Sequence, residues 1–304
     1  MKAANGLVHP RLSIGRFSFS VSDAEFLEVY TDEDLFQSTG VRIAFTGRQG
    51  GFSTGAYASL NLGSQVGDTY NTVLRNRYRL AAALGFEDYP LAVPRQIHGD
   101  HLTVLTEATV PTAWIDDLNA GADGIIIEQV PVAALLCFAD CASVIMVAPS
   151  GIFAVVHAGW RGVMASIAPV ALTQLAARTQ CLPADCNVYV GPHIRSECFE
   201  VSTELADRFV NRFGSASAPD SRHVSLIEAL RTDLVEHGAN SARIADCAVC
   251  TACHPDQFFS YRMQQGICGR HGAFAARRVL QPTDTNGSQA DTSGLSALLS
   301  DYAC

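Results

Sequence analysis

The stretch from residue 124 to residue 162, GIIIEQVPVAALLCFADCASVIMVAPSGIFAVVHAGWRG, decides the fold class. Its apolar runs each have the length of a single β-strand, and they lie at 124–128, 132–138, 143–147 and 152–156. The turns between them, EQVP, ADCA and APSG, are too short to hold a crossover helix. The spacing therefore predicts an antiparallel meander rather than alternating strands and helices.

Further strands and helices are expected on both sides of this centre. Short β-rich runs lie at 41–46, 102–105, 187–190 and 273–279. Apolar residues recur at every third or fourth position, which predicts helices, at 71–84, 163–178, 202–213 and 225–237. The expected fold class is α+β, with a mixed, largely antiparallel sheet flanked by helices in a single domain.

The ends of the predicted helices carry the residue types that favour starts and stops. Ser202 and Ser225 stand where an N-cap is needed, because a serine hydroxyl can accept from the first free backbone amides. Gly85, Gly214 and Gly238 follow three of the runs and are typical of helix ends.

The chain shows no linker, repeat or charge block that would divide its centre. We therefore expect one continuous domain over residues 41–280. Residues 1–40 are weakly patterned and are interpreted as an N-terminal segment. Residues 281–304 are rich in Ser, Thr, Asp and Gly, which is typical of a loose polar tail.

The composition excludes several classes of protein. With 304 residues, of which 48% are hydrophobic and 17% charged, the chain is too apolar to be disordered. A net charge of −9 argues against nucleic acid or an anionic membrane as the main partner, although a local basic pocket for a small anion remains allowed. No apolar run approaches the roughly 20 residues of a spanning helix, and no apolar block of a secretory signal follows the N-terminus. We expect a cytoplasmic monomer or small homo-oligomer with mostly reduced cysteines.

Three residues that interrupt the apolar centre or precede it are candidate metal ligands. Cys141 follows the most hydrophobic strand, His157 ends the run FAVVHAGWRG, and His98 closes the run LAVPRQIHG. One thiolate and two imidazoles make a good tetrahedral Zn²⁺ shell with one position open for catalysis. By spacing alone, two other interpretations stay open: ordinary buried cysteine and histidine, or Cys141 as a nucleophile with His157 as its base.

Polar residues near these three are candidates for catalysis and substrate binding. Arg48 lies in the Gly-rich stretch GRQGG and suits bidentate phosphate binding, and Arg161 opens a predicted helix, where anions bind. Asp140 and Asp123 could orient an imidazole or carry a proton, and His101 could donate one. The structural alternatives are solvated arginines, a turn or helix cap for Asp123, and polar filling for His101.

A series of motifs resembles one family in order along most of the chain. They are FTGRQGG at 45–51, YASLNLG at 57–63, QIHG at 96–99, ADG at 122–124, ADC at 139–141, VHAGWRG at 156–162, GPHI at 191–194, CFEV at 198–201, FFSYR at 258–262 and GR at 269–270. Residues 42 to 279 are thereby similar to the YfiH/LACC1 family, whose members are also labelled polyphenol oxidase or laccase-domain proteins.

The resemblance implies a single α+β domain with a zinc site formed by His98, Cys141 and His157. It also implies purine nucleoside phosphorylase activity on adenosine, inosine and methylthioadenosine, with inorganic phosphate as co-substrate and an adenosine deaminase side activity. Copper is a less favoured metal, because multicopper sites need many imidazoles, normally in His-x-His pairs, and the nine histidines form no such pair.

Three alternatives to this function stay open. The first is the copper-dependent polyphenol oxidase of the family label. The second is a Cys–His hydrolase or amidase acting in peptidoglycan-precursor editing, which would use the same residues without metal catalysis. The third is a non-enzymatic interaction protein stabilised by zinc, although a structural zinc normally takes a fourth protein ligand.

A cysteine-rich segment near the C-terminus has the close spacing of metal ligands. It contains Cys247, Cys250, Cys253 and His254, with Cys268 downstream. Only Cys250 matches a family position, so we interpret the others as local additions and as ordinary buried cysteines. Whether Cys247, Cys250 and Cys253 bind a second metal is left open by the sequence.

Overall fold

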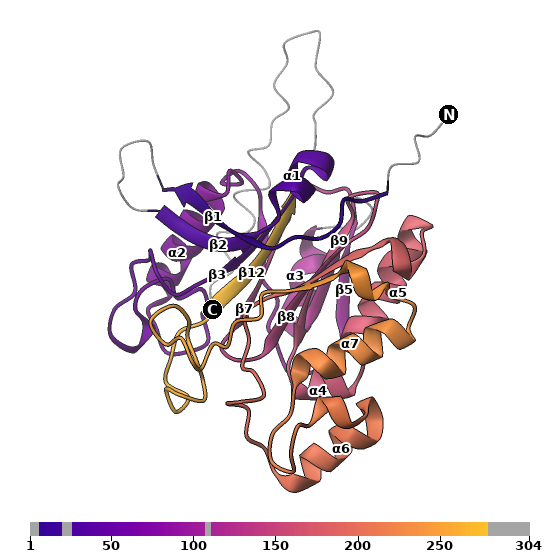
Figure 1. Cartoon of the computed structure of the whole chain (residues 1–304). Coiled ribbons are helices and arrows are strands. Elements are labelled where there is room, and N and C mark those ends of the chain that lie inside the picture. The colour runs from indigo at the N-terminus through magenta and orange to yellow at the C-terminus, as the bar shows by residue number, and fades with distance from the viewer. Residues whose placement is uncertain (1–5, 20–25, 107–110, 279–304) are drawn as a thin grey trace.

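The computed structural model describes residues 6–19, 26–106 and 111–278 (Figure 1). Two β-sheets pack face to face in the middle of the molecule, with helices on the outer side of each (Figure 1). Among the described helices, none has the length and apolar character needed to cross a membrane.

The first sheet has six strands in the order β1-β2-β3-β12-β7-β4. All its neighbouring strands run antiparallel except β4 and β7, which are parallel. The bounds are Ser13–Ser18 (β1), Phe26–Thr31 (β2), Val41–Thr46 (β3), Leu91–Ala92 (β4), Ala133–Phe138 (β7) and His271–Arg277 (β12).

The second sheet also has six strands, in the order β11-β10-β8-β9-β6-β5. Its two outermost pairs are parallel and the inner pairs antiparallel. The bounds are Leu102–Leu105 (β5), Gly124–Ile127 (β6), Ala142–Val147 (β8), Phe153–Ala158 (β9), Asn187–Val190 (β10) and Ile244–Asp246 (β11). Two mixed, largely antiparallel sheets flanked by helices confirm the α+β class.

Seven α-helices connect the described strands. Their bounds are Glu33–Thr39 (α1), Tyr70–Ala83 (α2), Pro111–Ala120 (α3), Trp160–Met164 (α4), Ile167–Thr179 (α5), Thr203–Phe213 (α6) and Leu226–Glu236 (α7). As predicted, the Ser202 hydroxyl accepts from the amide of Leu205 and caps α6, and Ser225 caps α7 in the same way.

The central strands of both sheets are buried on their two faces, whereas β1 and β2 at the edge of the first sheet are largely exposed or exposed on one side. Alternate residues such as Phe45 and Leu136 fill the space between the sheets, which we call the inter-sheet core. The outer face of the first sheet packs against α2, and that of the second packs against α4 and α5, with α7 and then α6 outside them (Figure 1). Each large apolar side chain buried in this way stabilises the fold by about 1.5–3 kcal/mol.

The predicted meander is correct only in part. Strands β8 and β9 form the expected hairpin, and β6 pairs antiparallel with β9. Strand β7, however, belongs to the first sheet, so the chain crosses between sheets at 128–132 and again at 139–141. Alternation could not reveal this crossing, because Leu135 faces outward, Leu136 faces inward, and both are fully buried.

The helix predicted at 163–178 is divided into α4 and α5. Ser166 lies between them with a left-handed φ of 57°, and its hydroxyl donates to the Asp233 carboxylate of α7 at 2.6 Å. The apolar spacing continues across this break, so the sequence pattern gives no sign of it. A contact with a residue 67 positions away fixes the interruption.

The N-terminal segment contains more regular structure than its sequence predicts. Strands β1 and β2 and helix α1 arise within residues 1–40, where the sequence shows only weak patterning, and β2 pairs with β3.

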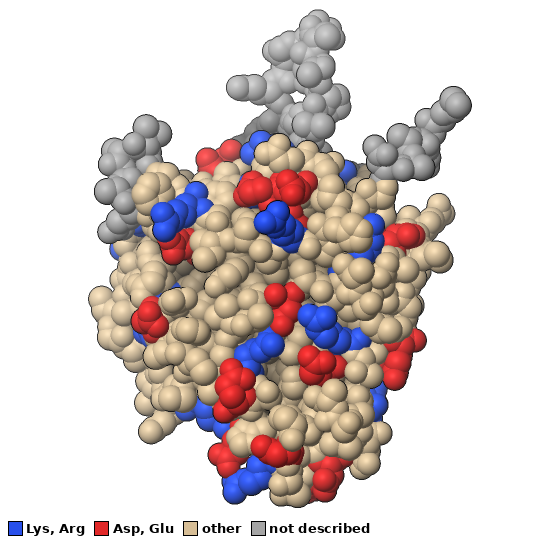
Figure 2. Space-filling view, viewed as in Figure 1, with Lys and Arg blue, Asp and Glu red and all other residues tan. Residues whose placement is uncertain are grey.

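The strand expected at 273–279 is β12, which begins at His271. Residue 279 and the polar tail 281–304 lie outside the described residues. Figure 2 shows positive and negative side chains interspersed over one face.

Candidate metal centre

Cys141, His157 and His98 meet at one end of the inter-sheet core. Cys141 stands on the turn where the chain crosses from β7 to β8, His157 is near the end of β9, and His98 lies in the loop after β4. Their ligand atoms all lie within 4.8 Å of one another. The two imidazole rings are 4.7 Å apart and almost perpendicular. The structure therefore brings together the three residues that the sequence singled out.

Asp123 connects His157 with the loop of His98 through hydrogen bonds. Its carboxylate is fully buried and lies 2.7 Å from His157 Nδ1. An ionised carboxylate only accepts hydrogen bonds, so Nδ1 carries the hydrogen and Nε2 is the nitrogen that could bind a metal. The same carboxylate accepts from the backbone amides of His98 at 2.9 Å and Gly99 at 2.7 Å. Burial would raise the Asp123 pKa, but these hydrogen bonds outweigh it and lower the pKa.

The backbone is strained at two places beside the ligands. His98 has a φ of 59° and Asp140 a φ of 83°, both in the left-handed region that favours glycine. Each such residue costs about 1–3 kcal/mol and persists only where its surroundings hold it. The Asp123 carboxylate holds the loop of His98, and contacts of Asp140 hold the turn before Cys141.

Asp140 differs from the expectation that it orients an imidazole. One of its carboxylate oxygens accepts from the Thr251 hydroxyl and the other from the Arg262 backbone amide, each at 2.7 Å. Its backbone carbonyl accepts from the amide of Ile194 at 2.9 Å. In the described contacts Asp140 therefore secures the turn that presents Cys141, and the imidazole is oriented by Asp123.

Gly159 and Gln96 position the site, although neither has a side chain that suggests catalysis or metal binding. A Cβ on Gly159 would lie 3.1 Å from Cys141 Sγ and 3.5 Å from a carbon of the His98 ring, so a side chain there would crowd the three candidate ligands. The Gln96 side chain donates to the Cys137 carbonyl and accepts from the Cys137 amide, which ties the His98 loop to β7. Both residues lie in the quoted motifs, but glycine and glutamine alone suggest no role.

The ionisable groups of the site are strongly coupled. Burial would raise the pKa of Cys141, but the adjacent His157 cation and hydrogen bonds from both imidazoles lower it to about 6. Burial would lower the pKa of His157, but the Cys141 thiolate and Asp123 raise it to about 9. Without a metal, the pair is thus a thiolate and an imidazolium between about pH 6 and pH 9.

The low pKa of Cys141 predicts its reactivity in metal-free protein. Alkylation of Cys141 by iodoacetamide should accelerate as pH rises through about 6, because the thiolate is the nucleophile and is then formed. An ordinary thiol would titrate near 8.5. The rate is measured by mass spectrometry of the Cys141 peptide over a pH series. A midpoint at pH 8 or above would contradict the thiolate–imidazolium pair.

The donor set is able to hold a metal ion. One soft thiolate and two neutral imidazoles are ligands of late divalent metals, and a carboxylate behind the imidazole is the usual support of such a ligand. His157 is buried, Cys141 is half-buried and His98 is exposed, so the group is open to solvent on the side of His98. A reactant could therefore approach a bound cation from that side.

In the described contacts, the arginines and His101 have partners other than the three candidate ligands. Arg48 donates to the carbonyl of Ala58 at 2.8 Å and to that of Pro255 at 2.7 Å, which uses two of its five N–H groups. Arg161 is exposed on α4 and stacks over Trp160. The His101 ring is half-exposed and lies 3.2 Å from the Asp117 carboxylate of α3.

His271 is a buried imidazole that lies outside the sequence motifs. It begins β12, opposite Phe138 of β7, and in the described structure neither ring nitrogen has a hydrogen-bond partner. Burial, with help from the charges of Arg270 and Arg48, lowers its pKa to about 3, so the ring is neutral. Its sequence context, an apolar strand, gave no signal.

The cysteines near the C-terminus group differently from their spacing. Cys250 and Cys253 approach Cys198, and their sulfur atoms form a second group of three donors. Cys247 instead packs against the inter-sheet core, and Cys268 is buried with Ala139 and Phe259. Sequence spacing missed Cys198, which precedes Cys250 by 52 positions.

Comparison with known proteins finds one family over most of the chain. Residues 42–278 match the family model described as multi-copper polyphenol oxidoreductase laccase. The chain is 34% identical to the purine nucleoside phosphorylase YlmD of Geobacillus stearothermophilus, over 79% of this chain and 91% of that protein. It is 31% identical to the adenosine deaminase RL5 of an unknown prokaryotic organism, over 68% and 82%.

A solved structure agrees with these relatives. The crystal structure of the hypothetical protein YfiH of Bacillus licheniformis superposes with a TM-score of 0.74 at 27% identity, covering 82% of this chain and 96% of that one. The resemblance stated from the motifs is thereby confirmed, and with it the α+β fold.

Proposed function

The chain belongs to the multi-copper polyphenol oxidoreductase laccase family, and we propose that it is a zinc-dependent purine nucleoside phosphorylase that also deaminates adenosine. The observation that carries the proposal is the convergence of His98, Cys141 and His157 over Asp123. The names of the relatives support an enzyme of the purine nucleoside phosphorylase type.

The donor chemistry favours zinc over copper. One thiolate and two imidazoles with an open position are the ligand pattern of catalytic zinc. A multicopper oxidase needs many imidazoles, and among the described residues only the group of His98, Cys141 and His157 combines two imidazoles. The chain therefore belongs to the family that this description names, but its donor residues favour zinc chemistry over multicopper oxidation.

The two proposed reactions act on different atoms of adenosine, C1′ in phosphorolysis and C6 in deamination. Phosphorolysis breaks the bond from C1′ to the purine nitrogen and forms one from C1′ to a phosphate oxygen, giving adenine and ribose 1-phosphate. Deamination replaces the amino group at C6 by oxygen from water, giving inosine and ammonia. A bound zinc ion would supply Lewis-acid activation of an oxygen or nitrogen at the reacting centre.

The chain's own residues position the reactants. Asp123 keeps a proton on His157 Nδ1, and its contacts to the loop of His98 fix the second imidazole. Gly159 leaves room beside the ligands. Arg48, and Arg161 on the exposed side, are the proposed cationic partners of phosphate, which needs donors as negative charge shifts during the reaction. Asp140, Asp123 and His101 remain proposals for proton transfer or substrate contact.

The test is direct incubation with nucleosides. Zinc-loaded protein is mixed with adenosine, inosine or methylthioadenosine, with and without phosphate, and the products are separated by chromatography. Free base with pentose 1-phosphate should appear only with phosphate, and inosine should form from adenosine in both conditions. Absence of free base from every mixture and of inosine from the adenosine mixtures would refute the proposal.

A Cys–His hydrolase is the second candidate, because the Cys141 thiolate and His157 imidazolium resemble an activated nucleophile and its base. The two candidates respond oppositely to a chelator. Removal of metal should abolish nucleoside turnover by a zinc enzyme, whereas a hydrolase that uses the Cys141 thiolate without metal should stay active.

Replacement of Arg48 should separate the two proposed activities. Arg48→Ala is expected to lower the phosphorolysis rate by about 100-fold, as for loss of one preorganised donor to a developing charge, and to leave deamination within about threefold. Both rates are measured on the same preparation. Equal losses in both would show that Arg48 serves only to brace the loops of Ala58 and Pro255.

Arg243→Ala is the matched control for this variant. Arg243 also donates to a backbone carbonyl, that of Leu7 at 3.1 Å, but it precedes β11 at the end of the second sheet away from Cys141. Its replacement should change neither activity by more than about twofold at a temperature where the protein stays folded.

A further inference from the structure

Three cysteines form a compact group outside the site already described. Cys198 comes from the loop after β10, and Cys250 and Cys253 come from the loop after β11. Their sulfur atoms all lie within 4.8 Å of one another, and the sulfurs of Cys198 and Cys253 are 3.4 Å apart. Cys250 is buried, Cys198 is half-buried and Cys253 is exposed.

The backbone around Cys250 is arranged to receive a charged sulfur. The amide of Arg195 donates to Cys250 Sγ at 3.4 Å, and the amides of Ala252 and Cys253 donate to the same sulfur. Several N–H groups directed at one sulfur stabilise the thiolate, because they offset the loss of water around its charge. A neutral thiol needs no such set of donors.

The closeness of the three sulfurs disfavours negative charge on them unless a cation is present. Three negative charges this close together would repel, whereas a cation between them would reverse the balance and displace the thiol protons. The three sulfurs are therefore already placed to bind one cation, but they carry no charge until it binds.

We propose that Cys198, Cys250 and Cys253 are a second metal site, which takes a thiophilic d¹⁰ cation, Zn²⁺ or Cu⁺. A tetrahedral zinc with bonds of about 2.3 Å to sulfur places its sulfurs about 3.8 Å apart, inside the range that the group already spans. Binding displaces three thiol protons to water. The exposed side at Cys253 is the route of entry and leaves room for a water as fourth ligand of Zn²⁺, while Cu⁺ accepts three sulfurs alone.

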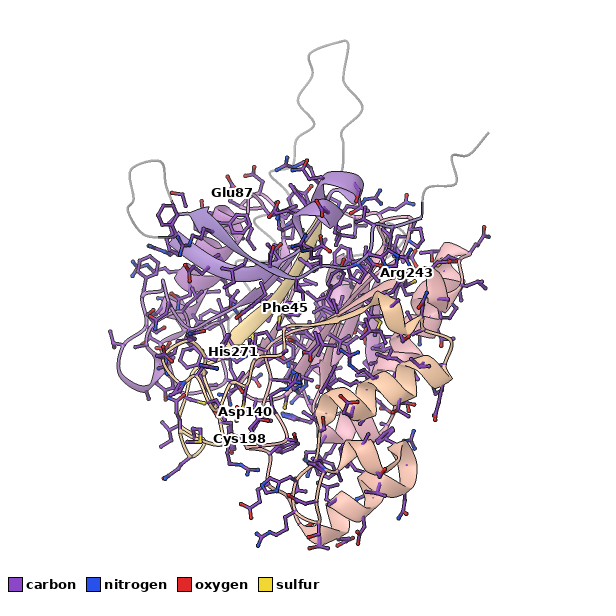
Figure 3. All side chains as sticks on the ribbon, in the orientation of Figure 1. Phe45, Glu87, Asp140, Cys198, Arg243 and His271 are labelled. Carbon is purple, nitrogen blue, oxygen red and sulfur yellow. The ribbon has the colours of Figure 1, made fainter. Side chains whose placement is uncertain are left out.

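The location gives this second site a consequence for the first. Thr251, between two of the cysteines, donates to Asp140, and Asp140 precedes the ligand Cys141. The amide of Thr251 also donates to the His193 carbonyl at 3.1 Å. Figure 3 labels Asp140 and Cys198 near one another in that view, below the middle of the molecule. A cation that joins the two loops would thus brace the turn that presents Cys141.

Metal stoichiometry tests the proposal in the full chain. Protein stripped of metal is reloaded anaerobically with Zn²⁺ or with Cu⁺, freed of excess, and analysed by mass spectrometry of the elements. Wild type should retain two equivalents of one cation in at least one of the two arms, and Cys253→Ser should retain one. Because Cys253 is exposed, its replacement should not disturb folding, and Cys198→Ser should repeat the loss.

Cys181→Ser is the matched control. Cys181 lies 3.7 Å from the sulfur of Cys186, a contact of two sulfurs that belongs to neither group of three donors. This variant should keep two equivalents. Cobalt substitution adds an independent readout, since sulfur-to-cobalt absorption should fall by more than half in Cys253→Ser.

The proposal is overturned if Cys253→Ser retains as many equivalents of metal as wild type does in both arms. It is also overturned if protein purified without reductant carries a disulfide between Cys198 and Cys253, seen as a loss of two hydrogens that persists after zinc is added. None of these outcomes depends on nucleoside turnover, so they stand apart from the proposed function.

Discussion

Replacement of Cys141 by alanine is expected to remove the metal of the His98–Cys141–His157 site and all nucleoside turnover. Two imidazoles alone form a weak site for Zn²⁺, because the thiolate supplies the negative charge and the strongest bond. Metal content should fall by one equivalent relative to wild type, and neither free base nor inosine should form. Elemental analysis and product chromatography on the same sample measure both effects.

Cys137→Ala provides the control for loss of a cysteine in the same region. Cys137 lies four residues earlier, on the outer face of β7, where its sulfur contacts the Leu62 carbonyl. That variant should keep its metal and its activity at a temperature where it is folded. Turnover that survives in Cys141→Ala at more than about one per cent would contradict the assigned role of the thiolate.

Replacement of Asp123 by asparagine should have the second largest effect. The carboxylate accepts from His157 and from the amides of Ile97, His98 and Gly99 while fully buried. An asparagine retains one accepting oxygen and turns an NH₂ group toward donors that need an acceptor. We expect metal affinity to fall by about 100-fold and the free energy of unfolding of the metal-free protein by about 3 kcal/mol.

These two effects are measured separately, by titration in a metal buffer and by unfolding in denaturant. Asp117→Asn is the control, because Asp117 is half-exposed and pairs only weakly with the exposed His101. It should change stability by a few tenths of a kcal/mol. Unchanged metal affinity in Asp123→Asn would show that the carboxylate does not orient the His157 ring.

The strands of this protein are predictable from sequence, but their division between two sheets is not. Runs such as 133–138 and 142–147 are short, apolar and bounded by turns, which identifies them as strands. Because both sheets are covered on both faces, inward Ile145 and outward Val144 look alike in the sequence. The crossing at Asp140 depends on Thr251 and Arg262, whose distance along the chain hides the connection.

Distance along the chain also explains which site residues could be predicted and which could not. His98, Cys141 and His157 carry distinctive chemistry at strand ends and stand in quoted motifs, so their type and position were informative. The contacts of Arg48 with Pro255 and the approach of Cys198 to Cys253 join segments more than 50 residues apart. A side chain committed to such a distant partner looks, in the sequence, like one free to bind a ligand.

X-ray absorption at the zinc edge tests the central claim most directly. Cys253→Ser protein that carries one equivalent of zinc leaves only the His98–Cys141–His157 site to be seen. We predict four scatterers: one sulfur at about 2.3 Å, and three nitrogen or oxygen atoms at about 2.0 Å, of which only two belong to imidazoles. A spectrum with no sulfur, with more than one sulfur, or with a third imidazole closing the shell would contradict the open catalytic site proposed here.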